Sequence, residues 1–136
     1  MSTPSARDVA IAACAASGLV HAWLVSVHLD EHLLAASFAA ATVGAAVVGY
    51  ALTRPELRFA PLAGAVLFAG LLAAYPIVVL ATDDNVDPLG LATKAVEAIG
   101  VAASLASRRR SESFGSADAL VGFVLAVFLT TLGHDH

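Results

Sequence analysis

This chain is poor in charged residues. Asp, Glu, Lys and Arg make up only 13% of its 136 residues, and 59% are hydrophobic. Ordinary soluble domains are about 25% charged. A fold of this length buries only about two-thirds of its surface, so it cannot hide so many apolar side chains from water. The composition therefore excludes an ordinary soluble domain. We expect a multi-pass protein of the cell membrane whose apolar surface is covered by the lipid bilayer.

Basic residues and cysteine are scarce as well. The formal net charge is -4, so nucleic acid is not an expected partner. Cys14 is the single cysteine, which excludes an intrachain disulfide. The run 11–14 resembles a lipoprotein cleavage box, but too few apolar residues separate it from Arg7 to form the apolar region of a signal peptide, which takes about 7–15 residues. We therefore expect an uncleaved first span.

Five apolar segments approach the length that crosses a bilayer. A helix needs about 20 residues to cross a hydrocarbon core of about 30 Å. The predicted spans are residues 8–29, 31–53, 60–81, 89–107 and 117–132, the last being the shortest. Asp30 is suited to cap the second helix, Pro55 ends it, and the acidic run 83–87 forms a loop before the fourth. The sequence thus predicts an all-α polytopic transmembrane bundle of about five helices, forming a single domain over residues 1–136.

The basic residues predict the orientation of this bundle. Lys94, inside the fourth predicted span, is the only basic residue that does not fall on the inner side of the five-span arrangement. The positive-inside rule then places the N-terminus in the cytoplasm, and five spans place the C-terminus outside. Without the short fifth span, the C-terminus would lie inside. The basic residues on the inner side are Arg7, Arg54, Arg58, Arg108, Arg109 and Arg110.

Small residues recur at every fourth position in the first three spans. Such rows let helix backbones approach closely where lipid provides no hydrophobic drive, so they predict packing faces. The rows are Ala10, Cys14, Gly18, Ala22 and Ser26 in the first span, Ala36, Ala40 and Gly44 in the second, and Ala65, Ala69 and Ala73 in the third.

Histidines gather at the predicted outer face. His28, Asp30 and His32 surround the turn between the first two spans, and His134 and His136 end the chain. Imidazole and carboxylate ligate transition metals, of which copper or zinc is expected here. A tight helical hairpin could bring two or three of these groups to one ion, and the tail histidines could complete its shell. Two other interpretations stay open: the groups are solvated at the headgroup level, or they form a protonation switch.

Two ionisable residues lie at similar depth inside predicted spans. His21 is about 10 Å below the outer end of the first span, and Glu97 is about 12 Å below that of the fourth. Ionisable groups in the membrane usually face the bundle interior and pair, so we expect His21 and Glu97 to meet, directly or through water. Lys94 is a rival partner for Glu97. The pair is interpreted as a proton relay, as the inner ligands of a metal site, or as a structural polar pair.

The sequence lacks the motifs of common enzymes. It contains no Gly-rich phosphate loop, no GxSxG and no HExxH. No pairing of a nucleophile with a base can be argued, so an enzyme is not expected.

The order of these motifs resembles a group of small bacterial and archaeal membrane proteins with four or five spans. The resemblance rests on residues 18–21, 28–33 and 54–55. That group shares a His…Glu-His first hairpin, an acidic residue in a later helix and often a histidine-rich C-terminal end, which Glu97 and residues 134–136 match. The resemblance extends over most of the chain in the order and spacing of these features. The resemblance implies a transmembrane fold and a place to look for a site, but no activity.

Three functions are compatible with these features. The leading hypothesis is a non-enzymatic membrane protein that binds or handles a transition metal through its outer histidines and carboxylates, with His21 and Glu97 beneath them. The second is a structural or accessory subunit, which would dock on partner membrane helices or on further copies of itself. The third is a small proton or ion pathway through His21 and Glu97.

Overall fold

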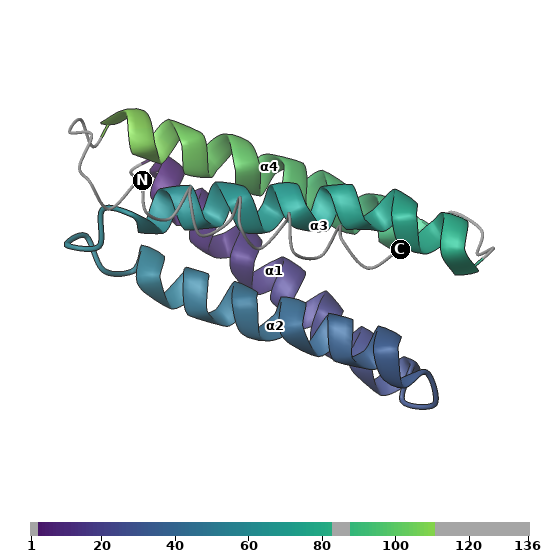
Figure 1. The fold of residues 1–136 in the computed structure, drawn as a ribbon. Helices are drawn as coiled ribbons and strands as arrows, with labels where there is room; N and C mark the ends of the chain where they lie inside the picture. The colour runs from purple at the N-terminus through teal and green to yellow at the C-terminus, as the bar shows by residue number, and fades with distance from the viewer. Residues whose placement is uncertain (1–2, 83–87, 111–136) are drawn as a thin grey trace, which may run out of the picture.

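The computed structural model describes residues 3–82 and 88–110, and this part of the chain is made of helices joined by turns (Figure 1). Each of its four helices is long and apolar enough to cross a membrane. Their ends lie within three residues of the first four predicted spans, whereas the predicted fifth span, 117–132, lies outside the described residues. The helices are α1 (Ala6–Val27), α2 (His32–Leu52), α3 (Ala60–Thr82) and α4 (Pro88–Arg110).

Local hydrogen bonds define where α1 begins. Ser5 and Asp8 form a capping box, in which the Asp8 backbone N–H donates to the Ser5 hydroxyl and the Ser5 backbone N–H donates to the Asp8 carboxylate. This arrangement satisfies N–H groups that the first helical turn leaves without partners. Proline-free apolar sequence then continues the helix to Val27.

The turn between α1 and α2 differs from the sequence prediction. The N-cap of α2 is Glu31, and Asp30 lies in the turn before it, so the prediction that Asp30 caps this helix is wrong. Glu31 makes no side-chain capping bond because its carboxylate contacts His28 Nδ1 at 3.0 Å. The His28 side chain thus binds Glu31, the last residue of the turn.

The four helices pack as two antiparallel hairpins. α1 packs along α2 and α3 along α4, while the packing of α1 on α4 joins the two hairpins. α2 and α3 make fewer contacts, and Figure 1 shows the hairpins diverging toward the end that holds the α1–α2 turn. We call this end, with residues 28–31, the turn end. The opposite end, where α1 and α3 begin, is the arginine end.

The arginine end is the more tightly packed part of the described bundle. Its buried core combines alanines with Leu52 and Phe68, which are both 0% exposed. Backbones approach closely here, because a Cβ atom built on Gly49 would lie 3.2 Å from the Cβ of Cys14. Small residues therefore do allow close helix packing in this half of the bundle.

Arg7 ties α1 to the last turn of α2 at the arginine end. Its guanidinium donates hydrogen bonds to the carbonyl oxygens of Leu52 and Arg54. Carbonyls at a helix C-terminus lack intrahelical donors and carry partial negative charge, so a cation suits them. This contact joins the beginning of the first hairpin to its end.

The predicted packing rows are right only in part. In α1, Ala10 and Cys14 are buried, but Ala22 and Ser26 are exposed. Positions four apart turn by about 40° around a helix of 3.6 residues per turn, so a row leaves the packing face within a few steps. The exposed members in α2 and α3 are Ala36, Ala40, Ala69 and Ala73.

Candidate functional site

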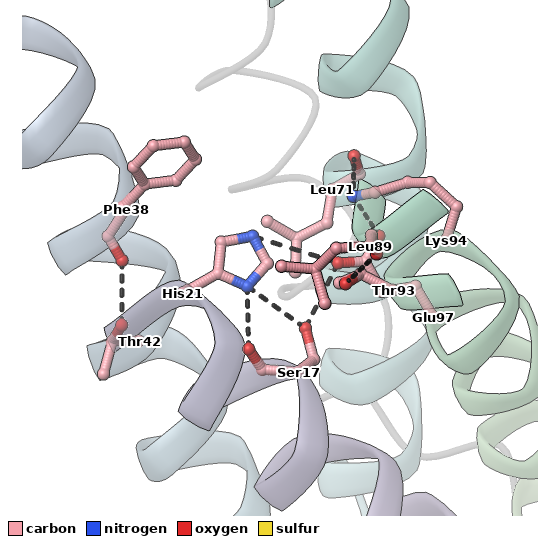
Figure 2. Close-up of polar contacts among 9 residues, drawn as sticks. All are labelled: Ser17, His21, Phe38, Thr42, Leu71, Leu89, Thr93, Lys94 and Glu97. Atoms are coloured by element: carbon pink, nitrogen blue, oxygen red, sulfur yellow. Dashed lines mark hydrogen bonds and ion pairs between the residues drawn. The ribbon is translucent and has the colours of Figure 1, made fainter. Parts of the chain in front are cut away.

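Four polar side chains meet in the middle of the bundle, between α1 and α4 (Figure 2). Ser17 and His21 lie one turn apart on α1, and Lys94 and Glu97 lie one turn apart on α4, so each pair shares one face of its helix. Ser17 is 1%, His21 6% and Glu97 0% exposed. The predicted meeting of His21 and Glu97 is thus seen in the structure.

The Glu97 carboxylate is held by two helices. Its Oε1 accepts a hydrogen bond of 3.1 Å from the Ser17 hydroxyl, and its Oε2 pairs with the Lys94 ammonium (Figure 2). A buried carboxylate without a partner would cost several kcal/mol. Lys94 supplies the opposite charge and Ser17 a donor, so Glu97 is compensated as an anion within the bundle.

Lys94 also connects the site to α3. Its ammonium donates to the carbonyl oxygen of Leu71 at 3.2 Å and lies 5.3 Å from the centre of the Tyr75 ring. An ammonium group has three N–H donors and is attracted to the face of an aromatic ring. The Glu97 carboxylate, the Leu71 carbonyl and the Tyr75 ring therefore account for the donors of Lys94. Glu97 thus has both of its predicted partners beside it, Lys94 and His21.

The backbone of α1 determines which ring nitrogen of His21 carries the proton. Nδ1 lies 2.8 Å from the carbonyl oxygen of Ser17. A carbonyl oxygen can only accept, so Nδ1 must donate, and the neutral ring then has a bare lone pair at Nε2. This Nε2 lies 3.9 Å from Glu97 Oε1, beyond hydrogen-bond distance. The neutral imidazole thus presents an unpaired acceptor beside a carboxylate.

The outer histidines are arranged differently from the predicted metal site. His28 contacts Glu31, while Asp30 and His32 are exposed in and after the same turn. Within residues 3–82 and 88–110, no three His, Cys, Asp or Glu side chains are close enough to hold one metal ion. The turn therefore offers no pre-formed metal site in the described part of the chain. The two tail ligands predicted by the sequence, His134 and His136, lie outside it.

A cavity of about 450 Å³ lies between the helices on the turn-end side of the polar site. It is lined by the halves of all four helices that lie beyond the tightly packed core. Its wall is mostly aliphatic and aromatic, and His21 and Lys94 connect it with the buried network. Phe38 of α2 stands within ring-contact distance of both His21 and His28, at 5.9 and 5.4 Å between centroids.

Several residues of this site are not among those predicted from the sequence. Ser17 had a signal, because it is a polar residue one helical turn before His21 in an apolar span. Glu31 likewise stands three residues after His28, at the spacing of a helical pair. The Leu71 carbonyl and the Phe38 ring had no signal in the sequence, since their positions depend on how the two hairpins pack.

No known protein family, curated protein or solved structure matches this chain. The functional argument therefore rests on the geometry of the site itself.

Proposed function

We propose that this chain is a small multi-pass protein of the cell membrane that takes up and passes a proton through His21 and Glu97. The observation that carries the proposal is the bare Nε2 of His21, 3.9 Å from Glu97 Oε1, inside a helix that can span the membrane. A proton placed on Nε2 converts two opposed acceptors into an imidazolium–carboxylate pair. Ionisable groups inside membrane helices are characteristic of proton relays.

The neighbouring charges support this role for His21. Lys94 and Glu97 form a pair with no net charge, so the site as a whole is neutral when His21 is neutral. Lys94 and Glu97 are engaged with one another, whereas Nε2 of His21 has a lone pair without a hydrogen bond. His21 is therefore the member of the group with an open position for a proton.

A pathway also needs contact with both sides of the bundle. On the turn-end side, the cavity reaches from His21 toward His28. On the arginine side, Ser104 lies seven residues beyond Glu97 on α4, about 10 Å further along the helix. Its hydroxyl is buried and has no hydrogen-bond partner among the described residues, so the proposal places it as the next polar group on that side.

Proton flux into liposomes tests the proposal. Purified protein is reconstituted with a trapped pH-sensitive dye, and a pH gradient is applied with the membrane potential clamped. We expect His21→Gln and Glu97→Gln to lower the flux by about a hundredfold, the scale on which loss of a positioned proton donor or acceptor acts. His21→Gln leaves the Lys94–Glu97 pair intact, so its loss of flux is not a consequence of an unpaired buried charge.

His32→Gln is the matched control, because His32 is exposed and lies outside the buried network. Its flux should equal that of the wild type. Wild-type flux no greater than that of empty liposomes, or unchanged flux in His21→Gln, would refute the proposed pathway.

The proposal includes five spans with the N-terminus in the cytoplasm and the C-terminus outside. The arginine end supports this orientation, since it gathers basic residues of α1, of α4 and of the α2–α3 connection, and basic residues favour the cytoplasmic side. A C-terminal tag tested in intact and opened cells measures the topology. Labelling only after the cells are opened would remove the fifth span from the proposal.

Metal handling and an accessory role are weaker proposals for this chain. The first lacks a three-ligand group in the described residues, and the second makes no use of the buried His21–Glu97 pair. The likeness to small membrane proteins with a His…Glu-His hairpin remains part of the proposal, and it adds no activity.

A further inference from the structure

The cavity at the turn end has the size and lining of a ligand site. Its volume of about 450 Å³ falls within the range of about 300–1,000 Å³ that small-molecule sites occupy. Such sites are mostly apolar and contain a few polar groups that fix the orientation of the ligand. Because hydrophobic helices surround this cavity, we expect an occupant that partitions into the bilayer.

Most polar groups in the wall already have partners. The hydroxyl of Thr93 donates to the carbonyl oxygen of Leu89, and that of Ser37 donates to the carbonyl oxygen of Leu33, both at 2.8 Å. The Lys94 ammonium is occupied by Glu97, Leu71 and the Tyr75 ring, as described above. These groups therefore offer no strong site for an anion or a cation.

Apart from Nε2 of the partly exposed His28 ring, two polar groups of the wall remain without a hydrogen bond in the described part of the chain. The Tyr75 hydroxyl is buried and has no partner, although the Tyr75 side chain lines the cavity. The second is Nε2 of His21, which the contact of Nδ1 with Ser17 leaves as a bare acceptor. One group is thus an unused donor and the other an unused acceptor. A buried polar group without a partner costs about 1–3 kcal/mol, so an occupant that satisfies both gains affinity.

We propose that this cavity binds a lipophilic alcohol or phenol whose hydroxyl group accepts a hydrogen bond from Tyr75 and donates one to His21 Nε2. A hydroxyl group is the smallest group that both accepts and donates. The apolar body of the molecule would lie against Phe38, Val78 and the other aliphatic side chains of the wall. This inference does not rest on the proposed proton pathway, because it concerns binding alone.

Three probes with one carbon skeleton separate the two hydrogen bonds. Farnesol can accept and donate, farnesyl methyl ether can only accept, and farnesene can do neither. Tritiated farnesol is bound to the full-length protein in nanodiscs and displaced by each unlabelled compound. We expect farnesol to bind about fivefold more tightly than the ether, and the ether about fivefold more tightly than farnesene, the effect of one neutral hydrogen bond each.

Tyr75→Phe removes only the hydroxyl group. In this variant, the ether should lose its advantage over farnesene, while farnesene itself binds as it does to the wild type. Tyr50→Phe is the matched control among the two tyrosines of the chain, because Tyr50 is exposed on α2 and its hydroxyl accepts from Arg54. It should leave all three affinities unchanged.

Ala74→Phe tests whether the probes occupy this cavity. Ala74 lines the cavity but is exposed, so a larger side chain there fills the space without entering the packed core. It should weaken all three probes. Equal affinities for farnesol and farnesene, no saturable farnesol binding, or an unchanged preference in Tyr75→Phe would each overturn the proposal.

Discussion

The contact between Gly100 of α4 and Phe68 of α3 gives a sharp test of the packing. A Cβ atom added to Gly100 would lie 2.5, 2.6 and 2.8 Å from three carbons of the Phe68 ring, all within 3.0 Å, where Cβ contacts essentially never occur. Phe68 is 0% exposed, so its ring has no open space into which it can turn. Gly100→Ala must therefore push α3 and α4 apart or force the ring out of its preferred rotamer.

The expected size of the effect follows from two opposing terms. Overpacking of a buried contact costs about 1–3 kcal/mol. Replacing a helical glycine by alanine returns up to about 1 kcal/mol through lower chain entropy and better helix propensity. We therefore expect Gly100→Ala to lower the free energy of unfolding by up to about 2 kcal/mol, the larger steric cost less the full return.

Gly70→Ala is the matched control on the same hairpin. A Cβ atom on Gly70 meets no atom within 4 Å, so only the favourable term remains. The two substitutions should change the free energy of unfolding in opposite directions, as measured by reversible unfolding in mixed micelles with increasing SDS. In the double variant Gly100→Ala/Phe68→Leu, the smaller side chain should cancel part of the steric cost. Equal or greater stability of Gly100→Ala compared with Gly70→Ala would refute the α3–α4 contact described here.

Two further predictions concern the ends of the bundle. Arg7→Gln should lower the free energy of unfolding by about 1 kcal/mol, because the guanidinium that binds the carbonyl oxygens of Leu52 and Arg54 is lost. Arg109→Gln, at an exposed position, is the control and should leave the free energy of unfolding unchanged in the same assay. The copper and zinc contents of purified wild type and of a His28→Ala/His32→Ala variant, measured by mass spectrometry, should be equal; stoichiometric metal in the wild type alone would restore the metal-handling hypothesis.

Hydropathy predicts four helices of this chain well because crossing a membrane is a local requirement. Each span must be continuous, apolar and about 20 residues long, so the sequence contains the whole signal. The ends depend on finer contacts. Asp30 had the right residue type for an N-cap, but the contact of Glu31 with His28 places the start of α2 one residue later.

The depth of ionisable residues in their spans predicted the pairing of His21 with Glu97. Depth follows from the helical rise, and the cost of an unpaired buried charge favours pairing in any compact bundle. The same reasoning cannot reveal the Leu71 carbonyl, because every residue has one and only packing selects it. Nothing in the sequence shows that the Tyr75 side chain lines a cavity.

The small-residue rows show a different limit. Spacing by four residues identifies positions that are near one another on a helix, but it does not say which of several rows faces a partner. In α1, the row through Ser17 and His21 is buried further along the helix than the predicted row, which leaves the interface after Gly18. Helix orientation is thus decided by the partner surface, which the sequence of one helix does not contain.

Ser17 gives the site its particular chemistry because it acts on both partners at once. Its carbonyl oxygen fixes the proton of His21 on Nδ1, and its hydroxyl group donates to Glu97 Oε1. Both proposals therefore depend on the same atom, the bare Nε2 of His21. A hydroxyl group bound there would occupy the lone pair that a proton needs, so an occupant of the cavity would oppose proton uptake. The two roles remain separable, because Tyr75 lines the cavity without touching the His21–Glu97 pair through any hydrogen bond in the described residues.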